Sequence, residues 1–268
     1  RALVSRSHRS VAQGVLALGL GLAPAVQGAD APPDWQAATP HPLQHGERVN
    51  GIDMLSQPLP DRSVIIGLQG EVTYLEYLKV VRALAPGVMT RGVPTDPPEL
   101  RLGAVEEALA SGQSPFLTRP LAGAAERWSL SALGPLVQVQ ESSRTAIPDN
   151  LSLLDSHMND AVTLAGWRTE PVAADDGQWV TLAWQVEAPI VEEWKVSLRR
   201  VSASGETIAQ HDAIPVHNAY PTSAWRPGEI ILDSYRLPPP PSDPGWVYHA
   251  ILYEAQSGTE VGRAEWQP

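Results

Sequence analysis

The feature that most constrains the fold of this chain is a series of seven short segments, from residue 162 onward, in which apolar and polar side chains alternate. Alternation with a period of two places successive side chains on opposite faces of a β-strand. Turn residues separate the segments, as at Asp175 to Gly177 and Ser202 to Gly205. Short strands at this spacing predict two packed antiparallel sheets, an immunoglobulin-like or jelly-roll β-sandwich over residues 149–268. The predicted strands are 162–167, 179–186, 194–201, 206–214, 229–237, 246–253 and 259–266.

Nine apolar side chains of these segments are expected to face the space between the two sheets. They are Leu182, Trp184, Val186, Val196, Leu198, Ile231, Val247, Ile251 and Tyr253. Tryptophan usage marks the same region, since seven of the nine tryptophans lie between Trp167 and Trp266. Large amphipathic rings suit both the core edge of a sandwich and a sugar-stacking surface, so composition leaves both uses open.

In the preceding part of the chain, the apolar pattern changes between the period of a β-strand and that of an α-helix. Extended segments at 63–67, 88–93 and 116–118 alternate with helical segments at 72–85 and 98–110, and a hairpin is expected over 128–140. A β-α-β-α-β order implies parallel strands joined by right-handed crossovers. Residues 61–148 are therefore predicted to form a small α/β domain, and the chain as a whole to be an α+β multidomain protein.

Two features of this predicted domain bear on packing and on ligands. In the first helix, one face is expected to carry Tyr74, Tyr77, Leu78, Val81 and Leu84 toward the core. A turn of small and polar residues follows the first strand, where folds of this kind place ligands. It lacks the glycine spacing of a phosphate-binding loop, so its glycines can equally serve only the turn. The residues of this candidate ligand turn are Gly67, Gln69, Gly70 and Glu71.

The N-terminal region has a basic start followed by an uncharged stretch from Ser10 to Gly28. This pattern fits either a secretory signal peptide or a retained membrane helix. We favour the membrane helix, because the chain does not start with methionine and a processed chain would have lost a cleaved signal. The predicted order is a cytoplasmic basic tail at 1–9, a membrane helix at 10–28 and a Pro-rich tether at 29–60, with the bulk of the chain extracytoplasmic.

Composition excludes several classes of function. The formal net charge is −11 with only two lysines, the opposite of the clustered positive charge that nucleic-acid binding requires. The absence of cysteine excludes thiolate catalysis, Cys-ligated zinc and iron–sulfur clusters. His41 and His45 have a helical metal-ligand spacing, but adjacent prolines exclude a regular helix there. Asp175 and Asp176 before a glycine are typical of a hairpin turn. We therefore expect no catalytic residue, no metal and no cofactor.

The decapeptide Tyr220 to Glu229 stands between two predicted strands and contains two prolines and a glycine. Such a segment is expected to be a rigid loop. Its two aromatic residues, Tyr220 and Trp225, are candidates for glycan contact because exposed aromatic rings stack on sugars. The alternative is that Trp225 packs beneath its own loop and anchors it. Burial of the Trp225 ring would decide for the anchor.

Several of these segments carry a resemblance to a known family. Leu182 to Val186, His211 to Ala213 and Tyr220 to Glu229 are similar to strands and a loop in the extracytoplasmic C-terminal region of bacterial multi-spanning, mannosyltransferase-like (GT-C) membrane proteins. Ser63 to Gly67 and the turn Ala85 to Val88 resemble the domain that follows the last membrane helices there. The turn departs from the family's pattern, since Gly87 replaces an acidic residue. The resemblance covers most of residues 60–268.

The resemblance implies a module that is attached to a membrane domain and is not itself catalytic. In that family the enzymatic acid lies in an early loop among the membrane helices, and this sequence contains no such region, so no catalytic residue carries over. We expect a non-catalytic, membrane-tethered extracytoplasmic module that acts in glycan handling or in contacts with other membrane-protein subunits. The alternatives are an accessory subunit of an unrelated membrane complex and an exported soluble carbohydrate-active protein.

Overall fold

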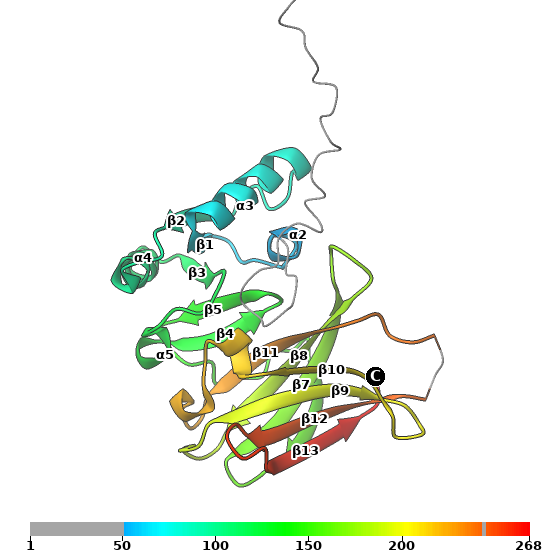
Figure 1. Ribbon diagram of the computed structural model, residues 1–268. Coiled ribbons are helices and arrows are strands. Elements are labelled where there is room, and N and C mark those ends of the chain that lie inside the picture. Colours follow the sequence, from blue (N-terminus) through cyan, green and yellow to red (C-terminus); the bar gives the residue numbers. More distant parts are fainter. Residues whose placement is uncertain (1–50, 243–244) are drawn as a thin grey trace, which may run out of the picture. The chain divides into compact units, whose positions relative to one another are not determined.

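The computed structural model describes residues 51–242 and 245–268, all of which belong to one compact unit. The predicted basic tail at 1–9, the predicted membrane helix at 10–28 and most of the predicted tether at 29–60 lie outside these residues. Within the described ranges, none of the helices has the length and apolar character needed to cross a membrane. The described chain is mostly β-sheet with a few helices, as the strand periods predicted (Figure 1).

A five-stranded mixed sheet forms the first part of the unit, in the order β2-β1-β3-β5-β4. The strand β1 pairs in parallel with β2 and β3, whereas β5 pairs antiparallel with β3 and β4. This arrangement confirms the β-α-β-α-β order and the hairpin at the sheet's edge. The elements are β1 (Ser63–Leu68), α3 (Gln69–Arg82), β2 (Met89–Val93), α4 (Pro98–Ala110), β3 (Ser114–Leu117), α5 (Ala124–Arg127), β4 (Ser129–Leu133) and β5 (Leu136–Gln140).

The face of α3 that packs inward coincides only in part with the predicted one, since Leu78 is buried and Tyr74 packs against the core as expected. Val72, Leu75 and Leu78 are buried, whereas Tyr77 is 44% exposed and Val81 is 55% exposed. The helix carries apolar residues on more than one face, and the sheet and a second helix cover the face with Val72 and Leu75. Periodicity identifies the apolar faces of a helix, but it does not show which of them packs against another element.

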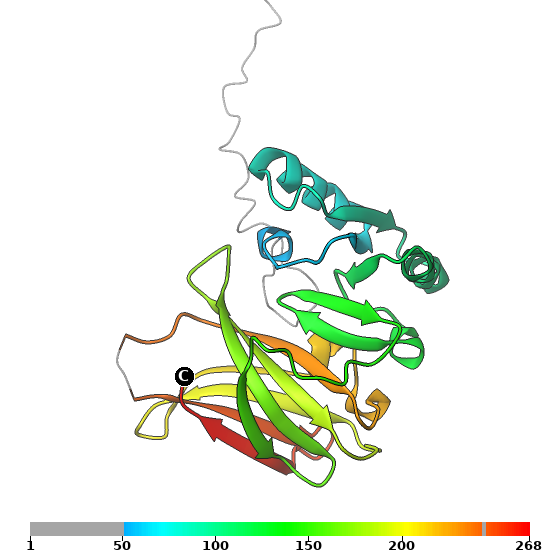
Figure 2. The same ribbon diagram turned by 180° about the vertical axis from the view of Figure 1, so that it is seen from behind.

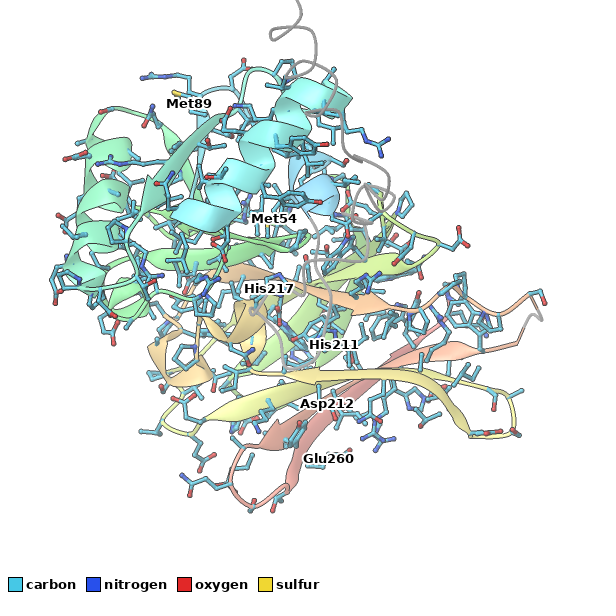
Figure 3. The ribbon with its side chains drawn as sticks, turned by 45° about the horizontal axis from the view of Figure 1, so that its top comes forward. Met54, Met89, His211, Asp212, His217 and Glu260 are labelled. Carbon is cyan, nitrogen blue, oxygen red and sulfur yellow. The ribbon has the colours of Figure 1, made fainter. Side chains whose placement is uncertain are left out.

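That second helix is α2 (Gly51–Leu55), which replaces irregular chain at the end of the predicted tether. It packs on α3, and its residue Met54 is almost fully buried (Figure 3). The contact requires a glycine at position 51, since a Cβ there would lie 2.8 Å from Leu78 Cδ1. The buried carboxylate of Asp53 accepts a 3.0 Å hydrogen bond from the Ala174 backbone N–H, far along the chain. These residues were therefore wrongly assigned to a tether, because a five-residue helix is too short to show a period.

The second part of the unit contains two four-stranded antiparallel sheets, in the orders β10-β9-β12-β13 and β11-β8-β7-β6 (Figure 2). All seven predicted strands are present, and β6 is an additional edge strand that its mostly exposed, polar side chains did not reveal. The strands are β6 (Ser152–His157), β7 (Val162–Pro171), β8 (Gln178–Val186), β9 (Trp194–Val201), β10 (Thr207–Ala213), β11 (Ile230–Leu237), β12 (Val247–Glu254) and β13 (Glu260–Trp266).

The inward face of β12 is the opposite of the predicted one. Tyr248, Ala250 and Leu252 belong to the main hydrophobic core, whereas Val247 and Tyr253 are only partly buried. Apart from His249 and Glu254, the residues of β12 are apolar or aromatic on both of its faces, so the alternation did not specify which face turns inward. Of the nine predicted inward residues, the six on β8, β9 and β11 do lie in this core.

One hydrophobic core continues from the five-stranded sheet into the sandwich. It includes Leu130 and Val137 from the sheet together with Leu182 and Ile231 from the sandwich. The strands β4 and β11 lie against each other, and the Leu232 backbone N–H donates a 3.3 Å hydrogen bond to Ser131 Oγ. The two parts therefore share their interior.

Candidate functional site

The predicted ligand turn lies at the carboxyl ends of β1 and β3, where the strand order reverses. The helices α3 and α4 cover opposite faces of the sheet, because Ile65 of β1 packs with the α3 side chains and Val64 and Ile66 pack with those of α4. In open α/β sheets, ligands bind in the crevice at such a reversal. The position predicted from sequence is therefore the right place to look for a ligand site.

In this structure, the side chain of Glu71 lies at this position and is bonded to its neighbours. Its Oε2 accepts hydrogen bonds from the Leu68 backbone N–H (2.9 Å) and from Thr118 Oγ1 (2.7 Å), and its Oε1 pairs with the Arg119 guanidinium. A carboxylate at a helix N-terminus is favoured by the helix dipole and by the free N–H groups there. Glu71 thus takes the place that an anionic ligand would take.

The other residues of the predicted turn serve this packing. At Gly67, a Cβ would lie 2.6 Å from Thr118 Oγ1 and 3.0 Å from Glu71 Oε2, so only glycine permits the close approach. The Gln69 side chain lies against Gly92 of β2, whereas Gly70 has open space around its Cα. The turn therefore locks β1 and α3 to β3, which is the structural use that the sequence left open.

The two candidate glycan-contact residues are buried, which overturns that prediction. Tyr220 is 0% exposed and Trp225 is 3% exposed. Trp225 Nε1 donates a 3.2 Å hydrogen bond to the Tyr220 carbonyl oxygen, and its ring lies 6.5 Å from that of Trp184. The alternative holds: Trp225 anchors its own loop, because the proline-bounded turn and the short helix η1 (Thr222–Ala224) direct the indole toward the core.

The end of this loop contains a fully buried carboxylate, Glu229. It accepts hydrogen bonds from Tyr220 Oη (3.0 Å), from the Arg226 backbone N–H (3.1 Å) and from Ser129 Oγ. Burial and the nearby Glu229 charge raise the pKa of the Tyr220 hydroxyl. Because Ser129 belongs to β4 and Glu229 immediately precedes β11, this carboxylate joins the loop, the sandwich and the five-stranded sheet at one point.

A second buried carboxylate, Asp233, lies four residues further along the chain, within β11. It accepts a 2.8 Å hydrogen bond from the Val216 backbone N–H and another from the Tyr235 hydroxyl. Burial raises the pKa of Asp233 to about 6. The Val216 bond holds a short segment, α6 (Pro215–Asn218), in which Val216 and His217 have φ values of 55° and 56°. A left-handed backbone at non-glycine residues persists only where such contacts impose it.

One histidine within this segment, His217, and one on β10, His211, are buried, and burial lowers the pKa of each to about 4 (Figure 3). His217 Nε2 donates a 2.6 Å hydrogen bond to the Gly134 carbonyl oxygen of the β4–β5 turn. The Arg236 backbone N–H donates a 3.2 Å bond to His211 Nδ1. Both rings are therefore neutral packing groups near pH 7.

Sequence reasoning missed Glu229, Asp233 and His217 as members of this buried network. A signal for Asp233 was present, since alternation places it on the same face as the inward-facing Ile231 and Tyr235. A charged side chain on the inward face of a strand indicates a buried hydrogen-bond network. Nothing in the sequence indicates that Ser129 lies beside Glu229.

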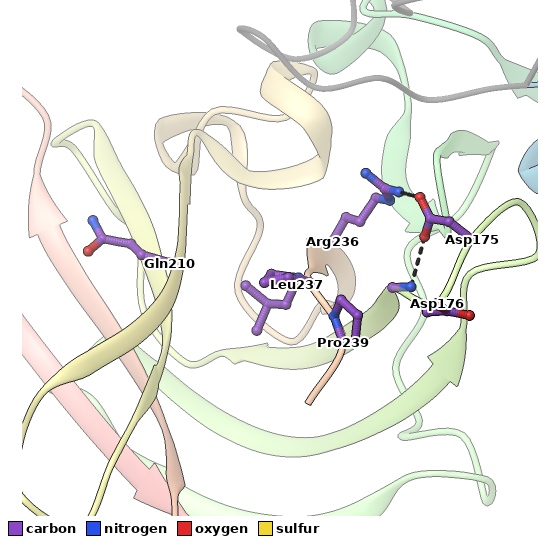
Figure 4. A pocket seen from close by; sticks show the side chains of 8 residues that line it. Asp175, Asp176, Gln210, Arg236, Leu237 and Pro239 are labelled. Atoms are coloured by element: carbon purple, nitrogen blue, oxygen red, sulfur yellow. Dashed lines mark hydrogen bonds and ion pairs between the residues drawn. The ribbon is translucent and has the colours of Figure 1, made fainter. Parts of the chain in front are cut away.

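An open pocket of about 450 Å³ lies at the end of β11 opposite to Glu229, beside the β7–β8 hairpin (Figure 4). Arg236 crosses it to pair with Asp175, whose other oxygen accepts a 2.8 Å bond from the Gly177 backbone N–H. Asp175 thus caps the hairpin turn that the Asp-Asp-Gly sequence predicted. Among the described residues, no three His, Asp or Glu side chains are placed to hold a metal ion.

Comparisons with known proteins identify no family. No protein-family model and no curated protein matches the chain. Among solved structures, a β-glucuronidase of glycoside hydrolase family 2 is 10% identical over 48% of this chain and 13% of its own, with a TM-score of 0.26. A family 2 glycosyl hydrolase from Bacteroides cellulosilyticus is 8% identical over 48% and 15%, with a TM-score of 0.26. An endonuclease/exonuclease/phosphatase from Beutenbergia cavernae is 13% identical over 37% and 26%, with a TM-score of 0.21. At these TM-scores the likenesses carry no argument.

Proposed function

We propose that this chain is a non-catalytic extracytoplasmic module, tethered to the membrane through residues 10–28 and related to the C-terminal region of bacterial glycosyltransferase-type membrane proteins. Its role in this proposal is to contact other membrane-protein subunits. The support for the tether comes from the sequence, in which an uncharged stretch from Ser10 to Gly28 follows three arginines. The proposal places residues 29–268 outside the cytoplasm.

One observation carries the non-catalytic part of the proposal. The loop Tyr220 to Glu229, the most characteristic segment of the family resemblance, directs its polar groups into the protein's own interior. Catalytic carboxylates act on a substrate in a cleft, whereas Glu229 is 0% exposed and bonded on three sides. Glu71 is likewise engaged by Leu68, Thr118 and Arg119. The residues that carry the resemblance therefore have structural roles in this chain, which supports an architectural module and not a reaction centre.

The topology also supports the prediction of an immunoglobulin-like sandwich. The chain crosses from one sheet to the other between β8 and β9, between β10 and β11, and between β11 and β12. Such Greek-key crossings between two antiparallel sheets are the pattern of immunoglobulin-like sandwiches, which serve widely as contact modules. Because the predicted glycan platform is buried, contacts with protein are the use that the structure favours for this module.

The anchor and the orientation are tested with single-cysteine reporters, since the chain has no cysteine of its own. In Val191→Cys the new thiol occupies a position that is 93% exposed. We expect this variant to sediment with carbonate-washed membranes and to react with a membrane-impermeant maleimide in intact spheroplasts. The matched control is Ala250→Cys, a position with 0% exposure that should react only after unfolding.

Two outcomes would overturn the proposal. Release of the chain into the carbonate supernatant would remove the anchor, and labelling of Val191→Cys only after lysis would place the module in the cytoplasm. A variant lacking residues 1–28 should be found in the soluble fraction, which assigns the anchor to that segment.

A further inference from the structure

The pocket at the end of β11 is bounded by three segments from different parts of the chain. They are the hairpin turn 175–177, Gln210 on the edge strand β10, and residues 236–239 at the end of β11 (Figure 4). We call this cavity the hairpin pocket. Its volume of about 450 Å³ lies in the range of about 300–1,000 Å³ that is typical of ligand sites. The cavity is therefore large enough to admit a side chain of another protein.

Bonds within the protein hold the walls of the hairpin pocket in place. Arg200, which is 0% exposed, donates hydrogen bonds of 3.0 Å and 3.1 Å from Nη1 to the carbonyl oxygens of Pro238 and Pro239. In the hairpin turn, Asp175 pairs with Arg236 at the end of β11. A site with fixed walls loses little conformational freedom when a ligand enters, so more of the contact energy remains as affinity.

The unpaired charge of the hairpin pocket is negative. Its lining contains two carboxylates and one guanidinium, and the guanidinium of Arg236 is paired with Asp175. The carboxylate of Asp176 is exposed and has no hydrogen-bond or ion-pair partner among the described residues. The surrounding sandwich, residues 149–268, contains 17 Asp and Glu against 7 Lys and Arg. Such a distribution of charge attracts cations and repels anions.

The wall formed by the end of β11 is apolar. It contains Leu237, Pro238 and Pro239, and both prolines are exposed. Proline has no backbone N–H, so these two residues offer a ligand no backbone donor. Lysine and arginine side chains carry a charged end on an aliphatic stem, and the stem packs along apolar surface while the charged end reaches polar groups. An unpaired carboxylate beside a proline wall matches these two side chains.

We propose that the hairpin pocket receives a lysine or arginine side chain of a partner subunit. The aliphatic stem lies against Leu237 and the two prolines, and the charged end pairs with Asp176. The inference rests on the proposed function, in which the chain contacts other membrane-protein subunits, and adds the chemistry of the residue that the partner presents. An exposed ion pair contributes little by itself, so the pocket holds one side chain of a larger contact.

The test is a calorimetric titration of the full chain, purified in detergent, with a defined peptide. The probe is an acetylated and amidated pentapeptide with arginine between two pairs of alanines. Its matched control contains citrulline, which has the shape of arginine without the charge. We expect the arginine peptide to bind about fivefold more tightly than the citrulline peptide.

Three variants localise the binding. Asp176→Asn should weaken binding of the arginine peptide about threefold, because it removes the carboxylate that pairs with the ligand. Gln210→Lys, at an exposed position, places a competing cation at the pocket and should abolish binding. Asp149→Asn removes the same charge from an exposed position elsewhere in the sandwich and should leave the affinity unchanged. Circular dichroism of each variant confirms that it is folded.

Each other outcome contradicts the proposal. Equal binding of the two peptides would show that charge is not recognised, and equal losses in Asp176→Asn and Asp149→Asn would mean general attraction to an acidic domain. Binding of agmatine without binding of the arginine peptide would assign the pocket to a free small cation. Maleimide labelling of Val191→Cys in spheroplasts is measured on the same chain. Labelling without peptide binding refutes only the pocket, whereas peptide binding without labelling refutes the extracytoplasmic placement.

Discussion

The buried carboxylate of Glu229 offers the sharpest test of how this molecule is held together. Replacing Glu229 by alanine removes the acceptor for three donors, which are Ser129 Oγ, Tyr220 Oη and the Arg226 backbone N–H. All of them lie in or beside the junction between β4 and β11. The perturbation therefore acts on the sandwich, on its loop and on the five-stranded sheet at once.

The expected loss follows from the donors left without a partner. A hydrogen bond to a charged group contributes about 1.5–3 kcal/mol, and a buried donor left unsatisfied costs about 1–3 kcal/mol. The two hydroxyls can rotate toward other acceptors, so the losses do not add fully. We expect Glu229→Ala to lower the free energy of unfolding by about 3–5 kcal/mol, a large share of the roughly 5–15 kcal/mol of a typical domain.

Urea unfolding followed by tryptophan fluorescence measures this loss, because eight of the nine tryptophans lie in the described residues. The continuous core predicts one transition for sheet and sandwich together. A double-mutant cycle with Ser129→Ala should give a coupling energy of about 1.5–3 kcal/mol, and Glu206→Ala on the exposed β9–β10 turn should change stability by less than about 0.5 kcal/mol. A coupling below about 0.5 kcal/mol, or two separate transitions, would refute the role of Glu229 as the junction.

Three further predictions concern single positions. Trp225→Ala should lower the free energy of unfolding by about 3–5 kcal/mol, measured by the same urea titration, because the indole is 3% exposed; a loss below about 1 kcal/mol would contradict its role as an anchor. Gly67→Ala should destabilise by about 1–3 kcal/mol through the clash with Thr118, while Gly70→Ala, with open space and a helical position, should stabilise by up to about 1 kcal/mol; equal effects would contradict the packing described for the turn. Burial raises the pKa of Asp233 in the folded protein to about 6, above its ordinary value of 3.8. As pH falls, the folded protein is therefore protonated at this group before the unfolded chain is. The contribution of Asp233 to stability thus rises as pH falls from 7 to 4. Relative to Asp233→Asn, the wild type should therefore gain about 1–3 kcal/mol over that range in urea titrations at several pH values, and a parallel pH dependence of both proteins would disprove it.

Local pattern predicted the elements of this protein well. The alternation at 179–186 and 194–201 and the helical period at 98–110 are properties of neighbouring residues, so β8, β9 and α4 have their expected bounds to within a residue. The edge strand β6 escaped because its side chains are mostly exposed and carry no apolar alternation. The existence and type of elements with one clearly apolar face are thus readable from sequence.

The sequence by itself determined where most strands and helices lie, that the chain is acidic and free of cysteine, and that a stretch before residue 30 is apolar. Three things required the folded structure: which face of β12 turns inward, that Trp225 is an anchor, and that Glu71 and Glu229 are bonded internally. The physical reason is that a period depends on neighbours in the chain, whereas burial depends on what another segment places opposite. Trp225 and Glu229 each have one partner far along the chain, Trp184 on β8 and Ser129 on β4, and no spacing along the chain records that proximity.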